Sequence, residues 1–167
     1  MVGGEESYGY LIGDSVRDKD AVASAVMIAE MAAYAKAQGR NVLEQLETIH
    51  REFGQYQERL ISITKKGRSG AQEIADMMTA LRNDPPKTLA SSPVVIAIDH
   101  SNSTQTDLRT GATSSTELPA SNVLQFITAA GDKVSARPSG TEPKIKFYFS
   151  VCTTTGDSHA ETKAELE

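Results

Sequence analysis

Apolar residues recur at helical spacing in the first third of the chain. Over residues 20–37 an apolar side chain returns every three or four positions, which is the period of one face of an α-helix. Asp20 can cap the first turn with its carboxylate, and Gly39 can end the last turn. The pattern predicts a helix over these residues, with its apolar positions at Val22, Ala25, Val26, Ala29 and Ala33.

A second helix is expected directly after the first. Asn41 and Glu44 have the spacing of a capping box, in which each side chain accepts a hydrogen bond from the backbone N–H of the other residue. Gly54 ends the apolar pattern. The apolar residues between these signals line one face of the predicted helix: Val42, Leu46, Ile49 and Phe53.

From Tyr56 onward the sequence favours a strand followed by a third helix. Residues 60–64 are rich in β-branched side chains, and the segment 65–68 that follows has the composition of a turn. Ser69 and Gln72 have the spacing of another capping box, and Pro85 with Pro86 can terminate the helix. Its apolar positions are Ile74, Met77, Met78 and Leu81.

The second half of the chain is dominated by strand patterns. Residues 94–98 form a short apolar run, and the polar stretch 99–121 is expected to hold a long turn or a hairpin. Residues 144–152 alternate between apolar and polar side chains, as in a strand with one buried face, and favour an antiparallel sheet. The remaining candidates are strands over residues 122–129 and 133–136, and a final helix capped by Ser158 with Glu161.

These elements divide the chain near Gly54 into two parts, residues 1–54 and residues 55–167. The second part is expected to be an α+β domain, with an open antiparallel sheet that helices cover on one face. The first part is expected to contain two helices and no strands, too little for a core of its own. We therefore expect it to be the carboxy-terminal remnant of an α/β domain whose strands lie upstream, in a natural chain that begins before Met1.

Composition excludes several classes of protein. Of the 167 residues, 39% are hydrophobic and 23% are charged, as in soluble globular proteins, and no apolar segment is long enough to span a membrane. A formal net charge of −5 argues against a general nucleic-acid binder, so any anion site must be local. Cys152 is the only cysteine and can form no internal disulfide, which favours a reducing compartment and a cytoplasmic protein.

The segment 137–144 has the chemistry of a phosphate clamp. The Arg137 guanidinium can hold two phosphate oxygens, while the hydroxyls of Ser139 and Thr141 can donate to the third. Gly140 lets backbone N–H groups approach an anion closely. An ordinary β-turn uses the same residue types for conformational reasons, and the composition alone favours that second interpretation.

The segment 4–9 has the chemistry of a sugar site. Neighbouring sugar hydroxyls can donate to a carboxylate such as that of Glu5, while Ser7 adds a hydroxyl and the ring of Tyr8 can cover an apolar face. Adjacent acidic residues are also common on protein surfaces. A solvated loop therefore remains the alternative.

Lys19 follows this candidate sugar loop closely at the start of the first predicted helix. It is either a solvated charge or a group that meets bound substrate as a general acid, a general base or a fixed positive charge. Helix capping explains the nearby Asp18 and Asp20 better than a metal site does, because their spacing does not match a calcium loop. The three histidines and Cys152 show no metal-ligand spacing either, so no metal site is expected in this chain.

Two motifs taken together are similar to those of one enzyme family. GGEESYGYLIGDSVRDKDAV at residues 3–22 and RPSGTEPKIKFY at residues 137–148 resemble the α-D-phosphohexomutases, in particular their bacterial phosphoglucomutase/phosphomannomutase branch. The resemblance implies the end of the third domain of such an enzyme, followed by its fourth domain, which has a TATA-binding-protein-like fold. It implies hexose phosphates of glucose or mannose as substrates.

The same resemblance implies roles for individual residues. It places sugar contacts on Glu5 and Ser7, and a basic residue implicated in acid–base chemistry on Lys19. It places phosphate contacts on a second set of residues: Arg137, Ser139, Gly140 and Thr141.

The family's reaction needs two further loops that this sequence lacks. One is a phosphoserine loop of the T-A-S-H-N type, and the other is a magnesium-binding D-G-D-x-D-R loop. The resemblance therefore implies that Mg²⁺ and a hexose 1,6-bisphosphate belong to a parent enzyme with upstream domains, and that this chain alone is inactive. A free-standing phosphate-binding or protein-interaction module without catalysis remains the alternative.

Overall fold

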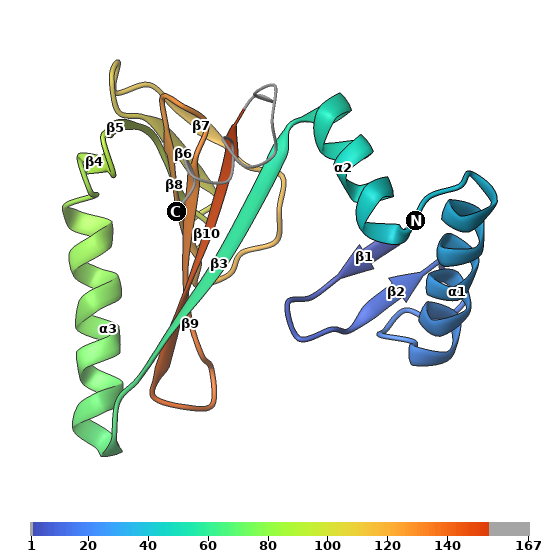
Figure 1. Ribbon diagram of the computed structural model, residues 1–167. Helices are drawn as coiled ribbons and strands as arrows, with labels where there is room; N and C mark the ends of the chain where they lie inside the picture. Colours follow the sequence, from blue (N-terminus) through green and yellow to red (C-terminus); the bar gives the residue numbers. More distant parts are fainter. Residues whose placement is uncertain (1, 154–167) are drawn as a thin grey trace. The chain divides into compact units, whose positions relative to one another are not determined.

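The chain forms two compact units in the structure, a computed structural model that describes residues 2–153 apart from the side chains of Arg68 and Thr153. The first unit is Met1–Phe53 and the second is Gly54–Glu167 (Figure 1). No helix in the described part of the chain is long and apolar enough to cross a membrane.

The first unit combines a β-hairpin with two helices. The hairpin strands pair antiparallel, with Gly3 opposite Leu11. The backbone N–H of Asp20 donates to the Tyr10 carbonyl at 2.9 Å, which ties the start of the first helix to the hairpin. The elements in chain order are β1 (Val2–Gly4), β2 (Tyr10–Ile12), α1 (Ala21–Ala37) and α2 (Val42–Phe53).

Both helices of this unit begin as the sequence predicts. The Asp20 carboxylate caps α1 by accepting hydrogen bonds from the backbone N–H groups of Val22 and Ala23, at 2.9 and 3.2 Å. Asn41 and Glu44 form the expected reciprocal capping box at the start of α2, with distances of 2.8 and 3.0 Å. The predictions of these two helices are confirmed.

The prediction that the first part contains no strands is wrong. Residues 2–4 and 10–12 form β1 and β2, although the first of these strands ends in two glycines. Glycine lowers strand propensity, but hairpin pairing depends on backbone hydrogen bonds, which need no side chain. Side-chain patterning therefore could not show this hairpin.

The second unit is an antiparallel sheet with one long helix. Within the described residues the sheet has eight strands in the order β3-β10-β9-β8-β5-β6-β7, with β4 paired to β5. This confirms the predicted α+β class and the hairpin expected within residues 99–121. The elements are β3 (Gln55–Thr64), α3 (Gly67–Asn83), β4 (Thr88–Leu89), β5 (Ser92–Asp99), β6 (Thr104–Asp107), β7 (Thr113–Ser115), β8 (Leu124–Thr128), β9 (Lys133–Pro138) and β10 (Lys144–Thr153).

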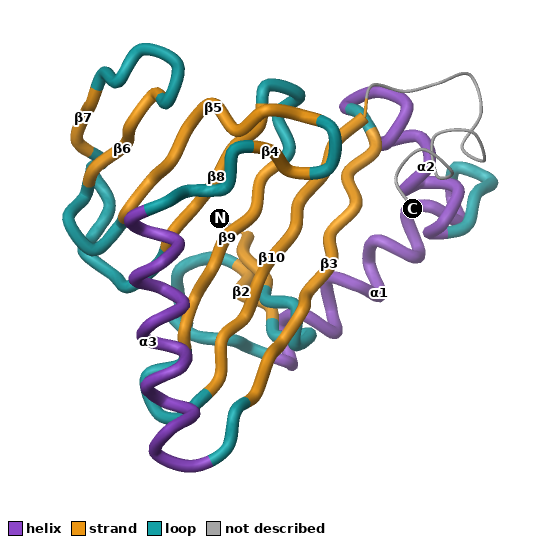
Figure 2. The backbone as a smooth tube through the Cα atoms, turned by 90° about the vertical axis from the view of Figure 1, so that its left-hand side faces the viewer, coloured by secondary structure: helices purple, strands orange, loops and turns teal. Residues whose placement is uncertain are grey.

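The core of the second unit lies between α3 and the sheet face that it covers. Figure 2 shows α3 running along the strands on one side of the sheet. The apolar side of α3, with Ile74 and Met78, packs on inward-facing residues of the central strands. Ile145 of β10 is fully buried there, in agreement with the alternation predicted for that strand. The other buried members of this cluster are Val94, Leu124, Phe126 and Ala136.

The predicted start of the third helix is wrong by three residues, because its N-cap is Lys66 and not Ser69. Instead of a capping box at Ser69, α3 begins at Gly67 after Lys66, and no side chain caps it. Gly67 has a φ of 69°, a left-handed conformation that glycine adopts without strain and that turns the chain from β3 into the helix. The final helix expected after Ser158 lies outside the described residues.

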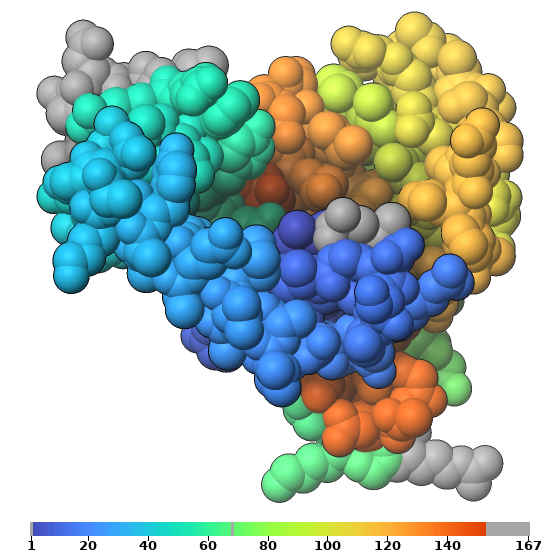
Figure 3. Space-filling view, turned by 90° about the vertical axis from the view of Figure 1, so that its right-hand side faces the viewer, coloured from blue at the N-terminus to red at the C-terminus, as the bar shows by residue number. Residues whose placement is uncertain are grey.

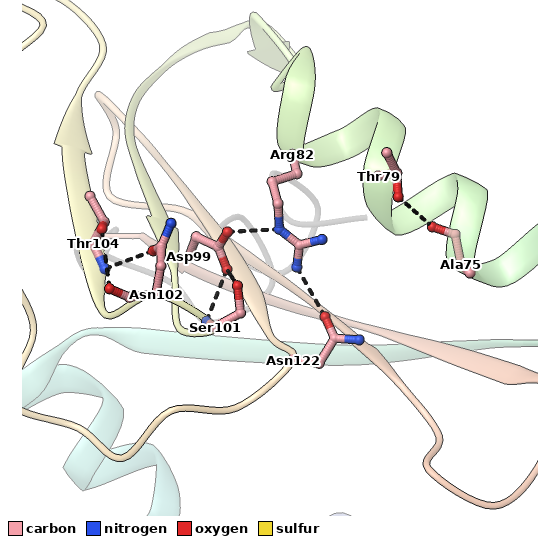
Figure 4. Close-up of polar contacts among 8 residues, drawn as sticks. All are labelled: Ala75, Thr79, Arg82, Asp99, Ser101, Asn102, Thr104 and Asn122. Atoms are coloured by element: carbon pink, nitrogen blue, oxygen red, sulfur yellow. Dashed lines mark hydrogen bonds and ion pairs between the residues drawn. The ribbon is translucent and has the colours of Figure 1, made fainter.

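Arg82 joins the end of α3 to the sheet (Figure 4). Its Nε donates to the Asp99 carboxylate at 2.7 Å, and one terminal nitrogen donates to Asn122 Oδ1 at 3.0 Å. The hydroxyl of Ser101 donates to the other Asp99 oxygen at 2.7 Å. Burial alone would raise the pKa of Asp99, but the hydrogen bonds from Ser101 and Arg82 outweigh it and hold that pKa below its ordinary value.

Candidate functional site

The β1–β2 turn places the candidate sugar-binding residues on the surface of the first unit. The Glu5 N–H donates to the Gly9 carbonyl at 2.9 Å, and the Tyr8 N–H donates to the Glu5 carbonyl at 3.2 Å, which closes the turn. Tyr8 has a φ of 62°, in the left-handed region. Its side chain is 86% exposed, so the ring is accessible to a ligand.

The Glu5 carboxylate contacts both of the other residues assigned to this site. Ser7 Oγ donates to Glu5 Oε2 at 3.2 Å. Lys19 Nζ donates to Glu5 Oε1 at 3.4 Å, in an ion pair whose two side chains are about half exposed. The structure therefore brings Glu5, Ser7 and Lys19 together, across fourteen residues of sequence between Glu5 and Lys19.

The backbone of Gly9 makes room for the Lys19 side chain. A Cβ added at Gly9 would lie 2.8 Å from Lys19 Cγ and closer still to Cδ, so any larger residue would displace the lysine stem. Asp18 holds Lys19 from the other side, because its Oδ1 accepts the Lys19 backbone N–H at 2.7 Å and lies 3.6 Å from Nζ. In the sequence Asp18 is recognisable only as a residue at the start of a helix, and no sequence signal shows its contact with the Lys19 ammonium.

The charges at this site act on each other. The hydrogen bond to Glu5, followed by the negative charges of Glu5 and Asp18, raises the pKa of Lys19 above its ordinary value. The hydrogen bond from the Lys19 N–H and the positive charge of Lys19 lower the pKa of Asp18. These groups surround a hollow of about 230 Å³ lined by Gly3, Gly4, Glu5, Gly9, Leu11, Asp18 and Lys19.

The candidate phosphate loop joins β9 to β10 in the second unit. The Ser139 N–H donates to the Lys144 carbonyl at 2.8 Å, which closes the base of the loop. Ser139 Oγ lies 3.4 and 3.3 Å from the backbone nitrogens of Thr141 and Glu142 and accepts from both. Because this hydroxyl accepts from the loop backbone, its own hydrogen is directed away from those two donors and is available to a ligand.

The phosphate loop borders a basic hollow of about 310 Å³. Arg137 is opposite Lys146 in the β9–β10 ladder, so both side chains lie on the sheet face away from Ile145 and the core. In Figure 3 the loop, in orange, lies next to the β3–α3 turn, in green, where the Lys65 N–H donates to the Pro143 carbonyl at 2.8 Å. The lining residues are Arg137, Pro138, Ser139, Gly140, Thr141, Lys144 and Lys146.

Two lysines add positive charge to this hollow. Lys144 Nζ pairs with Glu142 Oε2 at 2.9 Å, and this hydrogen bond lowers the pKa of Glu142. Lys146 Nζ lies 5.9 Å from the centre of the Tyr148 ring. Lys146 is not among the residues predicted for this site, although the alternation of β10 places it on the same face as Lys144.

The two loops suit different chemical groups. A carboxylate beside a hydroxyl accepts and donates hydrogen bonds to sugar hydroxyls, whereas an Arg with hydroxyl donors suits a phosphate. The described residues contain no group of three His, Cys, Asp or Glu side chains that could hold a metal ion.

Comparison with known families finds a match to the first unit. Residues 1–52 match the family described as phosphoglucomutase/phosphomannomutase, alpha/beta/alpha domain III. These residues include the β1–β2 hairpin and Lys19.

Curated relatives match most of the chain. It is 37% identical over 147 residues to the phosphoglucomutase of Staphylococcus haemolyticus, an alignment that covers 88% of this chain and 27% of the relative. It is 39% identical over 150 residues to a probable phosphomannomutase of Haemophilus influenzae, covering 89% of this chain and 27% of that protein. The chain therefore spans about a quarter of the length of these relatives.

A solved structure shares the fold. The open form of pp63/parafusin, a phosphoglucomutase from Paramecium, superimposes with a TM-score of 0.60 at 18% sequence identity. The match covers 99% of this chain and 28% of that chain.

Proposed function

Because the chain belongs to the phosphoglucomutase/phosphomannomutase family, we propose that it supplies the substrate-binding loops of an enzyme that interconverts hexose 1-phosphate and hexose 6-phosphate. The observation that carries the proposal is the basic hollow beside Arg137, whose lining combines a guanidinium, hydroxyls and a glycine. A glucose or mannose phosphate is the proposed ligand. A cytoplasmic location belongs to the same proposal.

The phosphate loop would hold whichever phosphate is not reacting. In this proposal Arg137 binds two phosphate oxygens through its forked guanidinium, and the Ser139 and Thr141 hydroxyls donate to the third. The absence of a side chain at Gly140 lets the ligand approach the loop backbone.

The β1–β2 turn would bind the sugar. Glu5 accepts hydrogen bonds from neighbouring hydroxyls, and Ser7 supplies one more donor or acceptor. Such contacts accept either phosphate orientation, because the two ends of a hexose ring can exchange places while hydroxyls remain near Glu5. The hexose 1,6-bisphosphate that the family resemblance implies as an intermediate would be held by the same two loops.

The chemistry itself would take place on upstream domains of the same enzyme. The described residues offer no ligand set that fits Mg²⁺, so none of the steps proposed for this chain involves the metal. The contribution of this chain is to orient the substrate for phosphoryl transfer, which accelerates a reaction by fixing the reacting groups in place.

Activity of a hybrid enzyme tests this function. In the hybrid, this chain replaces the matching segment of the Staphylococcus haemolyticus phosphoglucomutase. We expect the hybrid to interconvert glucose 1-phosphate and glucose 6-phosphate, and the isolated chain to show no turnover.

Arg137→Ala should lower kcat/KM of the hybrid by about a hundredfold or more, since charge-assisted hydrogen bonds contribute about 1.5–3 kcal/mol each and Arg137 makes two. Lys133→Ala removes an exposed cation from the far end of β9 and is the matched control. It should change kcat/KM of the hybrid by less than about twofold. Near-normal turnover with Arg137→Ala would refute the proposed phosphate clamp. Micromolar binding of glucose 1-phosphate by the isolated chain would favour the alternative of a free-standing binding module.

A further inference from the structure

We infer that Lys144 is a positioning residue, which holds the Glu142 carboxylate outside the basic hollow and so keeps that hollow open to an anion. This role rests on the proposed binding of phosphate by Arg137. The loop that would bind phosphate carries a carboxylate of its own, between Arg137 and Lys144. A carboxylate accepts the same forked hydrogen bonds from a guanidinium as a phosphate does, so its position decides whether the site is open.

The Glu142 side chain lies outside the hollow, although its neighbours in the loop line it. Gly140, Thr141 and Lys144 all belong to the lining, and Glu142 does not. Lys144 Nζ donates to Glu142 Oε2 at 2.9 Å, and the carboxylate is the outer member of this pair, with 62% of the Glu142 side chain exposed against 28% for Lys144. Lys144 therefore reaches from the wall of the hollow to a carboxylate beyond it.

The loop backbone supports this outward position of Glu142. Its N–H donates to Ser139 Oγ at 3.3 Å, and its carbonyl accepts the Lys144 N–H at 2.7 Å. The residue between the two charged side chains is Pro143, whose ring restricts the backbone there. The hydrogen bond from Lys144 lowers the pKa of Glu142, so the carboxylate remains charged and needs a cation beside it.

The same arrangement leaves the Arg137 guanidinium to a ligand. None of the ion pairs among the described residues includes Arg137. Without the Lys144 charge, the Glu142 carboxylate would be released to turn towards the hollow. There it would repel phosphate and compete with it for Arg137.

Three variants separate this positioning role from two simpler roles. They are Lys144→Met, which keeps the stem and removes the charge, Glu142→Gln, and the two substitutions combined. If Lys144 itself bound phosphate, Lys144→Met would weaken binding with or without Glu142→Gln. If only the net charge mattered, Glu142→Gln alone would strengthen binding as much as Lys144→Met weakens it. A positioning role predicts a loss in Lys144→Met, little change in Glu142→Gln, and restored binding in the double variant.

The first measurement follows the amide chemical shifts of residues 137–144 during titration of the chain with inorganic phosphate at one ionic strength. We expect Lys144→Met to raise Kd about three- to fivefold, given the strength of exposed charge pairs. Glu142→Gln and the double variant should stay within about twofold of the unsubstituted chain. Lys133→Met, which removes an exposed cation from the far end of β9, is the matched control and should do the same.

Three results of this titration would overturn the inference. The first is an unchanged Kd in Lys144→Met. The second is a double variant that binds as weakly as Lys144→Met, which would assign phosphate binding to Lys144 itself. The third is a gain of about threefold or more in Glu142→Gln alone, which would show that net charge is sufficient.

The second measurement uses turnover in the hybrid enzyme. Lys144→Met should mainly raise KM and keep kcat within about twofold, because the loop would hold a phosphate that does not react. Adding Glu142→Gln should restore KM. A fall in kcat of about tenfold or more that Glu142→Gln does not reverse would contradict a positioning role.

Failure of the proposed function gives a different result. In that case the unsubstituted chain shows no shifts at residues 137–144 and the unsubstituted hybrid shows no turnover, whereas failure of the positioning role alone leaves both intact. The release of Glu142 is tested without any ligand, by following the Arg137 Nε–H signal through the pH range in which carboxylates titrate. This signal should report the ionisation of Glu142 in Lys144→Met but not in the unsubstituted chain. An Arg137 signal that is insensitive to Glu142 in Lys144→Met would contradict the inference independently of the enzyme.

Discussion

Single residues at the turns decide whether the two candidate binding loops keep their shape. In the β1–β2 hairpin the decisive residue is Gly9, which leaves space for the stem of Lys19. In the β9–β10 loop it is Ser139, whose hydroxyl accepts from two backbone N–H groups. A separate prediction follows for each of these two residues.

Gly9→Ala should separate Lys19 from Glu5. The added Cβ would occupy the position of the lysine stem, so the side chain has to leave the hairpin surface. The pKa of Lys19 should then fall towards its ordinary value, as an NMR titration of its side chain would show. Gly3→Ala, where an added Cβ meets nothing within 4 Å, is the control. A Lys19 pKa that is the same in both variants would contradict this account.

Ser139→Ala should loosen the phosphate loop before any ligand is added. The backbone N–H groups of Thr141 and Glu142 lose their acceptor, and a hydrogen bond of this kind is worth about 0.5–1.5 kcal/mol. Their hydrogen exchange should therefore accelerate by about two- to tenfold. Ser150→Ala, on the β10 strand, should leave these two amides unaffected. Unchanged exchange at both amides in Ser139→Ala would show that the hydroxyl does not order the loop.

At the level of elements, local signals predicted the helices well because capping depends on residues three or four positions apart. Asp20 and the Asn41–Glu44 pair each work as the sequence indicates. The start of α3 was misplaced because the left-handed Gly67, rather than a side-chain cap, turns the chain into the helix. The β1–β2 hairpin was missed because its pairing is made by backbone groups around two glycines.

For the candidate sites too, the sequence predicted only the features that depend on neighbouring positions. The alternation of β10 was sufficient to place Lys144 and Lys146 on one face of the sheet. The approach of Lys19 to Glu5 depends on the hairpin and on the space above Gly9, neither of which periodicity reveals. Contacts between residues far apart in sequence therefore required the three-dimensional structure.

The attachment of α3 to β5 should depend on pH through Asp99. The pKa of Asp99 is lower in the folded chain than its ordinary value of 3.8, so its contribution to stability is complete above that value. It is lost as the pH falls through the lower pKa of the folded state. Both partners of the Arg82–Asp99 pair are less than one-third exposed.

Asp99→Asn should lower the free energy of unfolding by about 1–3 kcal/mol at neutral pH, measured by urea denaturation. The difference from the unsubstituted chain should shrink as the pH falls below 3.8, the ordinary pKa of an aspartate side chain. Asp84→Asn, at an exposed position after α3, should cost less than about 0.5 kcal/mol. Equal stability of the Asp99→Asn and unsubstituted chains at neutral pH would show that the Arg82–Asp99 ion pair does not stabilise the packing of α3 on the sheet.

At the level of the whole molecule, the two units differ in their capacity to fold alone. Within the described residues, the buried hydrophobic side chains belong to the second unit, with the exception of Ala35. Helix α1 is apolar on all sides, yet Val22, Val26 and Tyr34 are each more than half exposed. Helices of this composition are normally buried on all sides, so the first unit lacks the packing that such a helix requires.

Residues 54–167 alone should therefore stay folded, whereas residues 1–53 alone should not. Hydrogen exchange of each piece measures this, with slow exchange expected at the central strands β8, β9 and β10 and fast exchange expected throughout α1. Strong protection of α1 in residues 1–53 alone would contradict the prediction. So would complete exchange of the central strands in residues 54–167.

The most direct test of the central claim, that this chain binds a sugar phosphate through two loops, is chemical-shift mapping with glucose 1-phosphate. The account predicts shifts at residues 5–9 and at residues 137–144 together, with inorganic phosphate shifting only the second set. Arg137→Ala should abolish the response of residues 137–144. Shifts confined to other parts of the chain, or a response of residues 137–144 that survives Arg137→Ala, would contradict the account.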